Sequence, residues 1–190
     1  MEHEFVEAKV FDKCDFTQIF LTKGEYDRCK FINCDFSSSD LAKLKFIECE
    51  FDGCNLSLAK LVKTYFCNVI FRNCKMLGLL FDTCNEFGFS VSFFKCNLSH
   101  SSFYKTKLKK TTFKDLNLYE TDFTECDLSG SVLDNCDLTR AVFENTNLEK
   151  TDFRTSFNYS LDPEKNRIKK ARFSLAGIAG LLNKYAIDIE

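Results

Sequence analysis

Large apolar residues recur every five positions along most of this chain, and this period constrains the fold more than any other feature. One series runs from Phe11 to Phe81 and a second from Phe93 to Phe153. A half-buried strand repeats every two residues and an amphipathic helix every 3.6, so neither element accounts for a period of five. A fixed period sustained over most of a chain indicates a repeat architecture in which stacked units share one core.

A second position of each five-residue unit, two residues before the large one, is usually small. Nine of the 11 cysteines stand there, among them Cys29, Cys49 and Cys126. Each unit is therefore expected to turn one large and one small side chain inward and three outward. The odd number of cysteines and the lack of a secretion signal argue against a disulfide framework, and the thiols lack the close C-x-x-C pairing of zinc sites. We expect free thiols, no metal and no other cofactor.

The repeated pattern, roughly A(D/N)LXX, resembles the pentapeptide repeat family over about residues 6–157. The resemblance implies an all-β fold, a right-handed quadrilateral β-helix with four units in each coil. Residues 20 apart in the sequence should then stack, as Phe31 would on Phe51 and Phe103 on Phe123. Stacked coils would lie about 4.8 Å apart and would pair through backbone hydrogen bonds.

The register of the repeat breaks once, within residues 82–92. Phe81 and Phe93 are twelve positions apart, where two units would take ten. The two extra residues form either a bulge that re-phases the coil or a protruding loop that bears exposed aromatic side chains. The candidate loop residues are Glu86, Phe87, Gly88 and Phe89.

Residues 161–190 are expected to cap the β-helix of residues 1–160, because the five-residue pattern stops there. Ser174 suits the N-cap of a short C-terminal α-helix, which Gly177 and Gly180 would weaken. The helix would cover the open end of the solenoid, or would also pair with a second copy about a two-fold axis, as the resemblance implies. One apolar stripe of this helix, the candidate dimer interface, comprises Leu175, Ile178, Leu181, Leu182 and Tyr185.

Charge is distributed unevenly along the repeats. Residues 95–114 hold six lysines and no acid, whereas residues 115–152 hold ten carboxylates against Arg140 and Lys150, a net charge of −8. All ten acids stand at outward positions of the repeat, so they form either an ordinary solvated surface or a surface that binds a basic partner. They are Asp115, Glu120, Asp122, Glu125, Asp127, Asp134, Asp137, Glu144, Glu149 and Asp152.

Little in the sequence suggests catalysis. His3 and His100 are the only histidines, and no dinucleotide-binding, P-loop or zinc-protease motif occurs. A filled interior would leave no pocket, so we expect no enzyme and no catalytic residue. The sequence also contains no apolar span long enough to cross a membrane and no secretory leader, which predicts a soluble, cytoplasmic protein.

Within the family, the chain resembles the bacterial proteins that guard DNA gyrase against poisons, the Qnr, McbG and AlbG group, and AlbG, the albicidin-resistance protein, most of all. The segments that carry this resemblance are "CNLSL" at 54–58, "CKMLG" at 74–78 and "IKKARFSLAGIAGLLN" at 168–183. It implies a homodimeric, DNA-mimicking rod that binds DNA gyrase or another type II topoisomerase through its acidic surface, protects it from a poison and does not itself bind nucleic acid.

Two further points stay open at this level. Qnr proteins depend on projecting loops, and here only the break at 82–92 could supply one, which favours a natural-product poison over a quinolone. A rod of this kind could instead be a structural adaptor or scaffold for an unrelated protein partner, and a DNA mimic can inhibit gyrase as well as rescue it.

Overall fold

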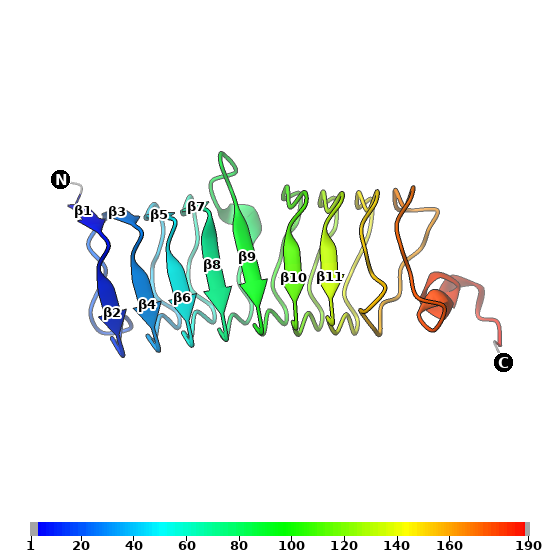
Figure 1. The fold of residues 1–190 in the computed structure, drawn as a ribbon, viewed down its shortest axis with the longest axis horizontal. Helices are drawn as coiled ribbons and strands as arrows, with labels where there is room; N and C mark the ends of the chain where they lie inside the picture. The colour runs from blue at the N-terminus through cyan, green and yellow to red at the C-terminus, as the bar shows by residue number, and fades with distance from the viewer. Residues whose placement is uncertain (1–3, 189–190) are drawn as a thin grey trace.

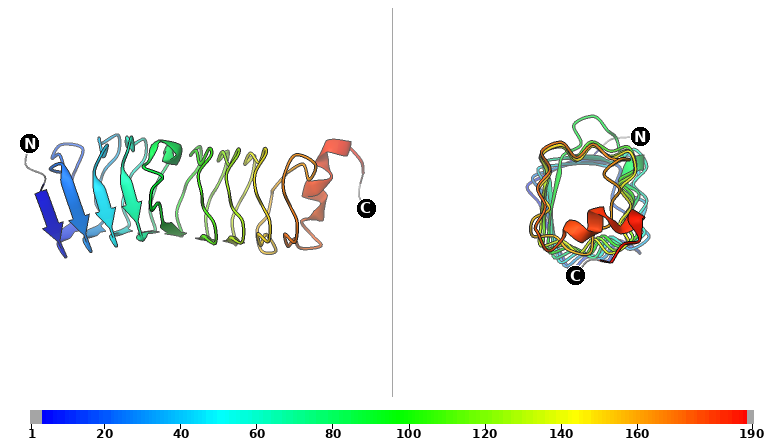
Figure 2. Two further views of the ribbon diagram at one scale, coloured as in Figure 1. Left: turned by 90° about the horizontal axis from the view of Figure 1, so that it is seen from above. Right: turned by 90° about the vertical axis from the view of Figure 1, so that its right-hand side faces the viewer.

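The computed structural model describes residues 4–188, which form a rod of stacked coils with a square cross-section (Figures 1 and 2). This shape agrees with the predicted quadrilateral β-helix, and every strand pair in it is parallel. One sheet contains β1 (Glu4–Glu7), β3 (Gly24–Asp27), β5 (Lys45–Ile47) and β7 (Tyr65–Cys67). The other contains β2 (Val10–Asp12), β4 (Lys30–Ile32), β6 (Glu50–Asp52), β8 (Val69–Arg72), β9 (Val91–Phe94), β10 (Thr112–Lys114) and β11 (Val132–Asp134).

We number the four sides of the rod in chain order, starting from the side that contains β2. Side 1 carries the seven-stranded sheet, and side 4 begins with the four-stranded sheet. Sides 2 and 3 are held by isolated bridges, such as Asn117 to Asp137 on side 2 and Ser102 to Asp122 on side 3. After β7, the pairing on side 4 resumes only with the bridge from Lys107 to Asp127.

Stacked residues are 20 apart in the sequence, as the repeat predicted. Phe31 pairs with Phe51 within the seven-stranded sheet. Across the break the offset becomes 22, because Phe71 pairs with Phe93. The two extra residues are therefore accommodated between β8 and β9, and on side 1 the ladder continues across the break.

Columns of phenylalanine rings fill the interior. The rings of Phe31 and Phe51 stack with centroids 4.6 Å apart, and those of Phe103 and Phe123 stack at 5.3 Å. Rings on adjacent sides meet edge to face, as Phe113 meets Phe123 at 6.2 Å. Because offset stacks and edge-to-face contacts are the favoured aromatic geometries, a single residue type packs in every direction.

Most of the small inward residues carry hydroxyl or thiol groups, and many of these groups donate hydrogen bonds to the preceding coil. The Thr64 hydroxyl donates to the carbonyl of Leu41 at 2.8 Å, and the Cys49 thiol donates to that of Tyr26 at 3.2 Å. Burial raises the pKa of Cys49 to about 12, so it remains a neutral thiol. All 11 cysteines are free, and those at this position serve as compact core residues that also satisfy a buried carbonyl.

The C-terminal segment differs from the predicted α-helix. The ladder runs past the boundary predicted at residue 160, because Asp152 pairs with Arg172. Beyond it the chain forms two short 3₁₀ helices, η2 (Ile178–Leu181) and η3 (Asn183–Tyr185), which lie across the end of the rod (Figure 2). A third one-turn 3₁₀ helix, η1 (Phe81–Thr83), precedes the loop at the break. Positions 1–3 and 189–190 of the two predicted segments lie outside the described residues.

Two glycines explain why this segment is not α-helical. A Cβ on Gly177 would lie 2.1 Å from the Tyr159 hydroxyl oxygen, and a Cβ on Gly180 would lie 2.1 Å from the Tyr159 carbonyl oxygen. Both glycines must therefore face Tyr159. With three residues per turn, a 3₁₀ helix brings positions 177 and 180 into line, whereas in an α-helix they would lie about 60° apart around the axis. Within residues 4–188, the structure contains no helix that is long and apolar enough to cross a bilayer.

Candidate partner-binding surface

Some of the ten predicted acids hold the corners of the coils. Asp122 accepts a hydrogen bond from the backbone N–H of Thr124 at 2.8 Å, and Asp137 accepts one from Thr139 at 3.1 Å. Asp127 and Asp152 make the same contact two residues along. These are Asx turns, in which the side chain replaces a backbone acceptor. The asparagine in the matching position of other units, such as Asn117, does the same, so the Asp/Asn of the repeat has a structural role that the sequence analysis did not identify.

Most of the ten acids are also paired with cations from neighbouring coils. Two short contacts between coils join Glu120 to Arg140 at 3.0 Å and Glu149 to Arg167 at 2.8 Å. Among residues 4–188, only Asp115, Asp122 and Asp137 of the set have no cation within 4.0 Å. The other pairs are Glu125 with Lys105, Asp127 with Lys109, Asp134 with Lys114, Glu144 with Lys165, and Asp152 with Arg172 and with Arg154 of its own coil.

The acidic coils therefore lie between two basic layers. The lysines of residues 95–114 reach the acids from one side, and arginines and lysines of residues 154–172 reach them from the other. Exposed ion pairs of this kind typically contribute between zero and about 1 kcal/mol each. The charge of −8 in residues 115–152 is thus largely compensated in the free protein, by weak contacts that a partner could replace.

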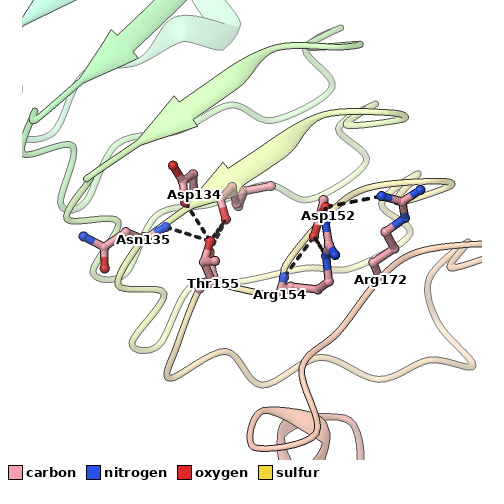
Figure 3. Close-up of polar contacts among 8 residues, drawn as sticks. Asp134, Asn135, Asp152, Arg154, Thr155 and Arg172 are labelled. Atoms are coloured by element: carbon pink, nitrogen blue, oxygen red, sulfur yellow. Dashed lines mark hydrogen bonds and ion pairs between the residues drawn. The ribbon is translucent and has the colours of Figure 1, made fainter.

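Asp152 is the most highly connected of these acids (Figure 3). Its carboxylate lies 2.7 Å from the Arg154 guanidinium and 3.7 Å from that of Arg172. The Arg154 guanidinium holds the pKa of Asp152 below its usual value of 3.8. Nearby, the Thr155 hydroxyl donates to Asp134 at 2.9 Å and accepts from the backbone N–H of Asn135 (Figure 3).

A pH dependence of stability follows from this carboxylate. Because its pKa is lower in the folded chain than in the unfolded chain, ionised Asp152 stabilises the fold above about pH 4, and that contribution is lost as the pH falls through the folded value. We expect Asp152→Asn, which keeps the Asx turn, to lower the Tm at pH 7. Thermal unfolding of both proteins between pH 7 and pH 2.5 should show the difference narrowing in acid. A constant difference at all pH values would contradict this assignment.

The break in the repeat projects from the rod as a loop (Figures 1 and 2). Of its two aromatic residues, Phe87 is 79% exposed, whereas Phe89 packs inward with its ring 6.5 Å from that of Phe66. Gly88 between them has a φ of +67°, and a Cβ there would lie 2.7 Å from the Tyr65 hydroxyl oxygen. The glycine therefore permits the tight turn that points one phenylalanine outward and its neighbour into the core.

The five candidate dimer residues do not share one environment. Leu175 is 88% exposed, and Ile178 and Tyr185 are about half exposed. Leu181 packs against the core cluster, and Leu182 is half-buried. The outer part of the stripe is thus available to a second copy, while Leu181 attaches the segment to the rod.

Metal-ligating side chains are scattered over the described part of this surface. Across residues 4–188, no three His, Cys, Asp or Glu side chains are placed to hold a metal ion. His100 lies on the outer surface, with Nδ1 3.1 Å from Glu120, and His3 lies outside the described residues. The groups that this surface presents are carboxylates, cations and hydroxyls, which form ion pairs and hydrogen bonds with one another.

Comparison with known proteins agrees with this architecture. The structure is similar to that of full-length QnrB1, titled a plasmid-mediated fluoroquinolone resistance protein. The match covers 97% of this chain and 100% of QnrB1, with a TM-score of 0.64 and 19% identity. A trypsin-treated variant of QnrB1 matches with a TM-score of 0.62 and 20% identity, over 99% of this chain and 98% of that variant. At this identity the likeness shows the fold alone.

No curated protein sequence matches the chain, and the predicted closeness to AlbG stays a prediction. The family model "Pentapeptide repeat region" matches residues 24–85 and 89–160, so the chain belongs to the pentapeptide repeat family.

Proposed function

We propose that this protein binds a type II topoisomerase, DNA gyrase in the first place, and protects it from a poison. The observation that carries the proposal is the likeness, over the whole rod, to a protein titled a fluoroquinolone resistance protein. The acidic coils of residues 115–152 and the projecting loop with exposed Phe87 support it, because each offers a feature that a partner can recognise.

The ion pairs refine how the rod would imitate DNA. A basic partner surface would have to displace Lys105, Arg167 and similar side chains from their acids, or accept them at the edges of the interface. Each displaced pair is exposed and contributes little, so the exchange costs little. Binding should then rest on the acids with no cation, Asp115, Asp122 and Asp137, and should weaken as salt screens the charges.

The test is a gyrase supercoiling and cleavage assay titrated with the purified protein, with and without a poison. We expect the triple variant Asp115→Asn, Asp122→Asn and Asp137→Asn to lose protection while remaining folded, because asparagine forms the same Asx turn at Asn117 and adopts the same positive φ at Asn135, which stacks on Asp115. A fluoroquinolone and a natural-product poison, assayed in parallel, would identify which class is relieved.

A matched control is available within the same fold. Asp15, Asp35 and Asp40 occupy in the N-terminal coils the turn position that Asp122 and Asp137 occupy here, and they accept the same backbone hydrogen bond. Their conversion to asparagine changes the net charge equally and should leave protection unchanged. Equal loss in both triple variants would contradict a local acidic interface. No effect of the wild-type protein on gyrase would favour the adaptor function instead.

The proposal includes a homodimer formed through the C-terminal segment. Leu175, Ile178, Tyr185 and Ile187 are exposed apolar residues there, and a two-fold contact between such surfaces would cover them. We expect Leu175→Glu to convert a dimer into a monomer without a change in the far-UV spectrum, measured by sedimentation velocity. A wild-type protein that sediments as a monomer at high concentration would contradict the dimer.

A further inference from the structure

The hydrogen-bonded ladder on side 4 is interrupted next to the projecting loop. Its last strand before the break is β7. The ends of the loop donate backbone hydrogen bonds to this coil, from Asn85 to the carbonyl of Thr64, just before β7, at 2.9 Å and from Ser90 to that of Phe66 at 3.0 Å. The next coil resumes at Lys107. Between these two coils, the chain that would have formed the missing strand turns outward into the loop instead (Figure 1).

The edge of the coil at Lys107 consequently lacks backbone partners. One coil later, the N–H of Asp127 donates to Thr106 at 2.9 Å, but the equivalent N–H of Lys107 has no partner within residues 4–188. The carbonyls of Asp127 and Ser129 accept from the coil before them at 2.8 and 3.0 Å, whereas those of Lys107 and Lys109 accept from no described residue. One backbone donor and two backbone acceptors thus line this edge, as on an unpaired edge strand.

A cavity lies between this edge and the loop. It has a volume of about 390 Å³, within the range of ligand-binding cavities. Phe81 and Phe89 give it an apolar lining, and Asp82 and Glu86 line it on the loop side. The Glu86 carboxylate lies 3.7 Å from Nζ of Lys107, and its side chain is almost fully exposed, so this contact is weak and easily replaced.

We propose that this gap receives a short extended segment of a partner protein that carries acidic side chains and adds to side 4 as a strand. Strand addition uses main-chain hydrogen bonds for affinity and side-chain neighbours for selectivity. The outward neighbours here would be Lys107 and Lys109, and opposite charges on adjacent strands attract. The fold already contains this arrangement, since Glu25 on β3 lies 3.2 Å from Lys45 on β5. The proposal stands whether or not the partner is a topoisomerase.

The free edge itself is tested by amide hydrogen exchange followed by NMR on the full chain. The Lys107 amide is expected to exchange at least about tenfold faster than the amide of Asp127, which occupies the same position with its hydrogen bond made. Equal protection of the two amides in the free protein would overturn the proposal, because no unpaired edge would then exist.

Binding is tested with a fluorescein-labelled peptide of sequence Ser-Asp-Val-Asp-Ser, acetylated and amidated at its ends. Saturable binding that slows exchange of the Lys107 amide is expected, and the analogue with lysine in place of aspartate should bind at least about tenfold more weakly. N-methylation of the valine amide, or Lys107→Pro in the protein, removes one main-chain hydrogen bond and should weaken binding about fivefold to tenfold. Lys107→Ala removes the side-chain charge but keeps the backbone N–H, so it measures the contribution of the charge alone.

The peptide controls keep the test valid if Lys107→Pro fails to fold, since they use the wild-type protein. Equal binding of the aspartate and lysine peptides, equal binding of the N-methylated peptide, or no binding at millimolar concentration would each overturn the proposal. Protection of the Asp127 amide should not change in any arm, because that hydrogen bond is already made within the rod.

Discussion

Phe123→Ala is expected to lower the free energy of unfolding by about 3–5 kcal/mol, the usual cost of truncating a fully buried aromatic residue. Phe123 has no exposed surface and stacks between Phe103 at 5.3 Å and Phe143 at 5.2 Å. The substitution would leave a void in the middle of a column that has no other side chain to fill it. In a solenoid each coil contacts only its neighbours, so the defect should also uncouple the coils on either side.

Urea unfolding followed by far-UV circular dichroism measures this effect. The midpoint should fall, and the transition should broaden or split in two as the halves of the rod unfold separately. Phe87→Ala removes the same side chain from a position that is 79% exposed, and should change the free energy of unfolding by less than about 0.5 kcal/mol. A Phe123→Ala protein with the wild-type midpoint would show that the column is not what holds the coils together.

The sequence predicted the core well because the repeat places every inward residue by its phase. Phe31 over Phe51 and Phe103 over Phe123 were expected from a 20-residue coil, and the structure stacks both pairs. The count of residues also located the break between Phe81 and Phe93. Periodicity is a property of the chain itself, so no knowledge of distant contacts was needed for these predictions.

Contacts between side chains on different coils were harder to predict. The pairing of Glu149 with Arg167 depends on the side chains that stacking brings together and on the rotamers they adopt, neither of which the period specifies. The loop posed the same problem, because Phe87 and Phe89 are identical in type and only the turn at Gly88 separates their directions. The prediction of an α-helix after Ser174 was wrong, because Gly177 and Gly180 pack closely against Tyr159, and helix propensity does not reflect such a contact.

Gly180→Ala is expected to detach the C-terminal segment from the end of the rod. The added Cβ would lie 2.1 Å from a backbone oxygen of Tyr159, which cannot rotate away, so the segment must shift at a cost of about 1–3 kcal/mol. The shift would break the hydrogen bond from the Leu161 N–H to the Gly180 carbonyl, now 3.0 Å long. Faster exchange of the Leu161 amide, with unchanged exchange in the central coils, is the expected result.

Gly177→Ala provides the contrast that separates a local clash from a general loss of flexibility. Its Cβ would lie 2.1 Å from the Tyr159 hydroxyl oxygen and 2.7 Å from the ring carbon that carries it, so Tyr159→Phe removes the shorter of these two contacts and keeps the other. No side-chain change relieves the contact with the Tyr159 carbonyl oxygen at position 180. The double variant Gly177→Ala with Tyr159→Phe should therefore recover part of the Leu161 protection, and Gly180→Ala with Tyr159→Phe should recover none. Equal recovery in both would mean that the glycines are needed for their backbone freedom and not for their closeness to Tyr159. If the dimer forms through this segment, only the variants that detach it should also sediment as monomers, because Leu175 and Ile178 would lose their fixed position.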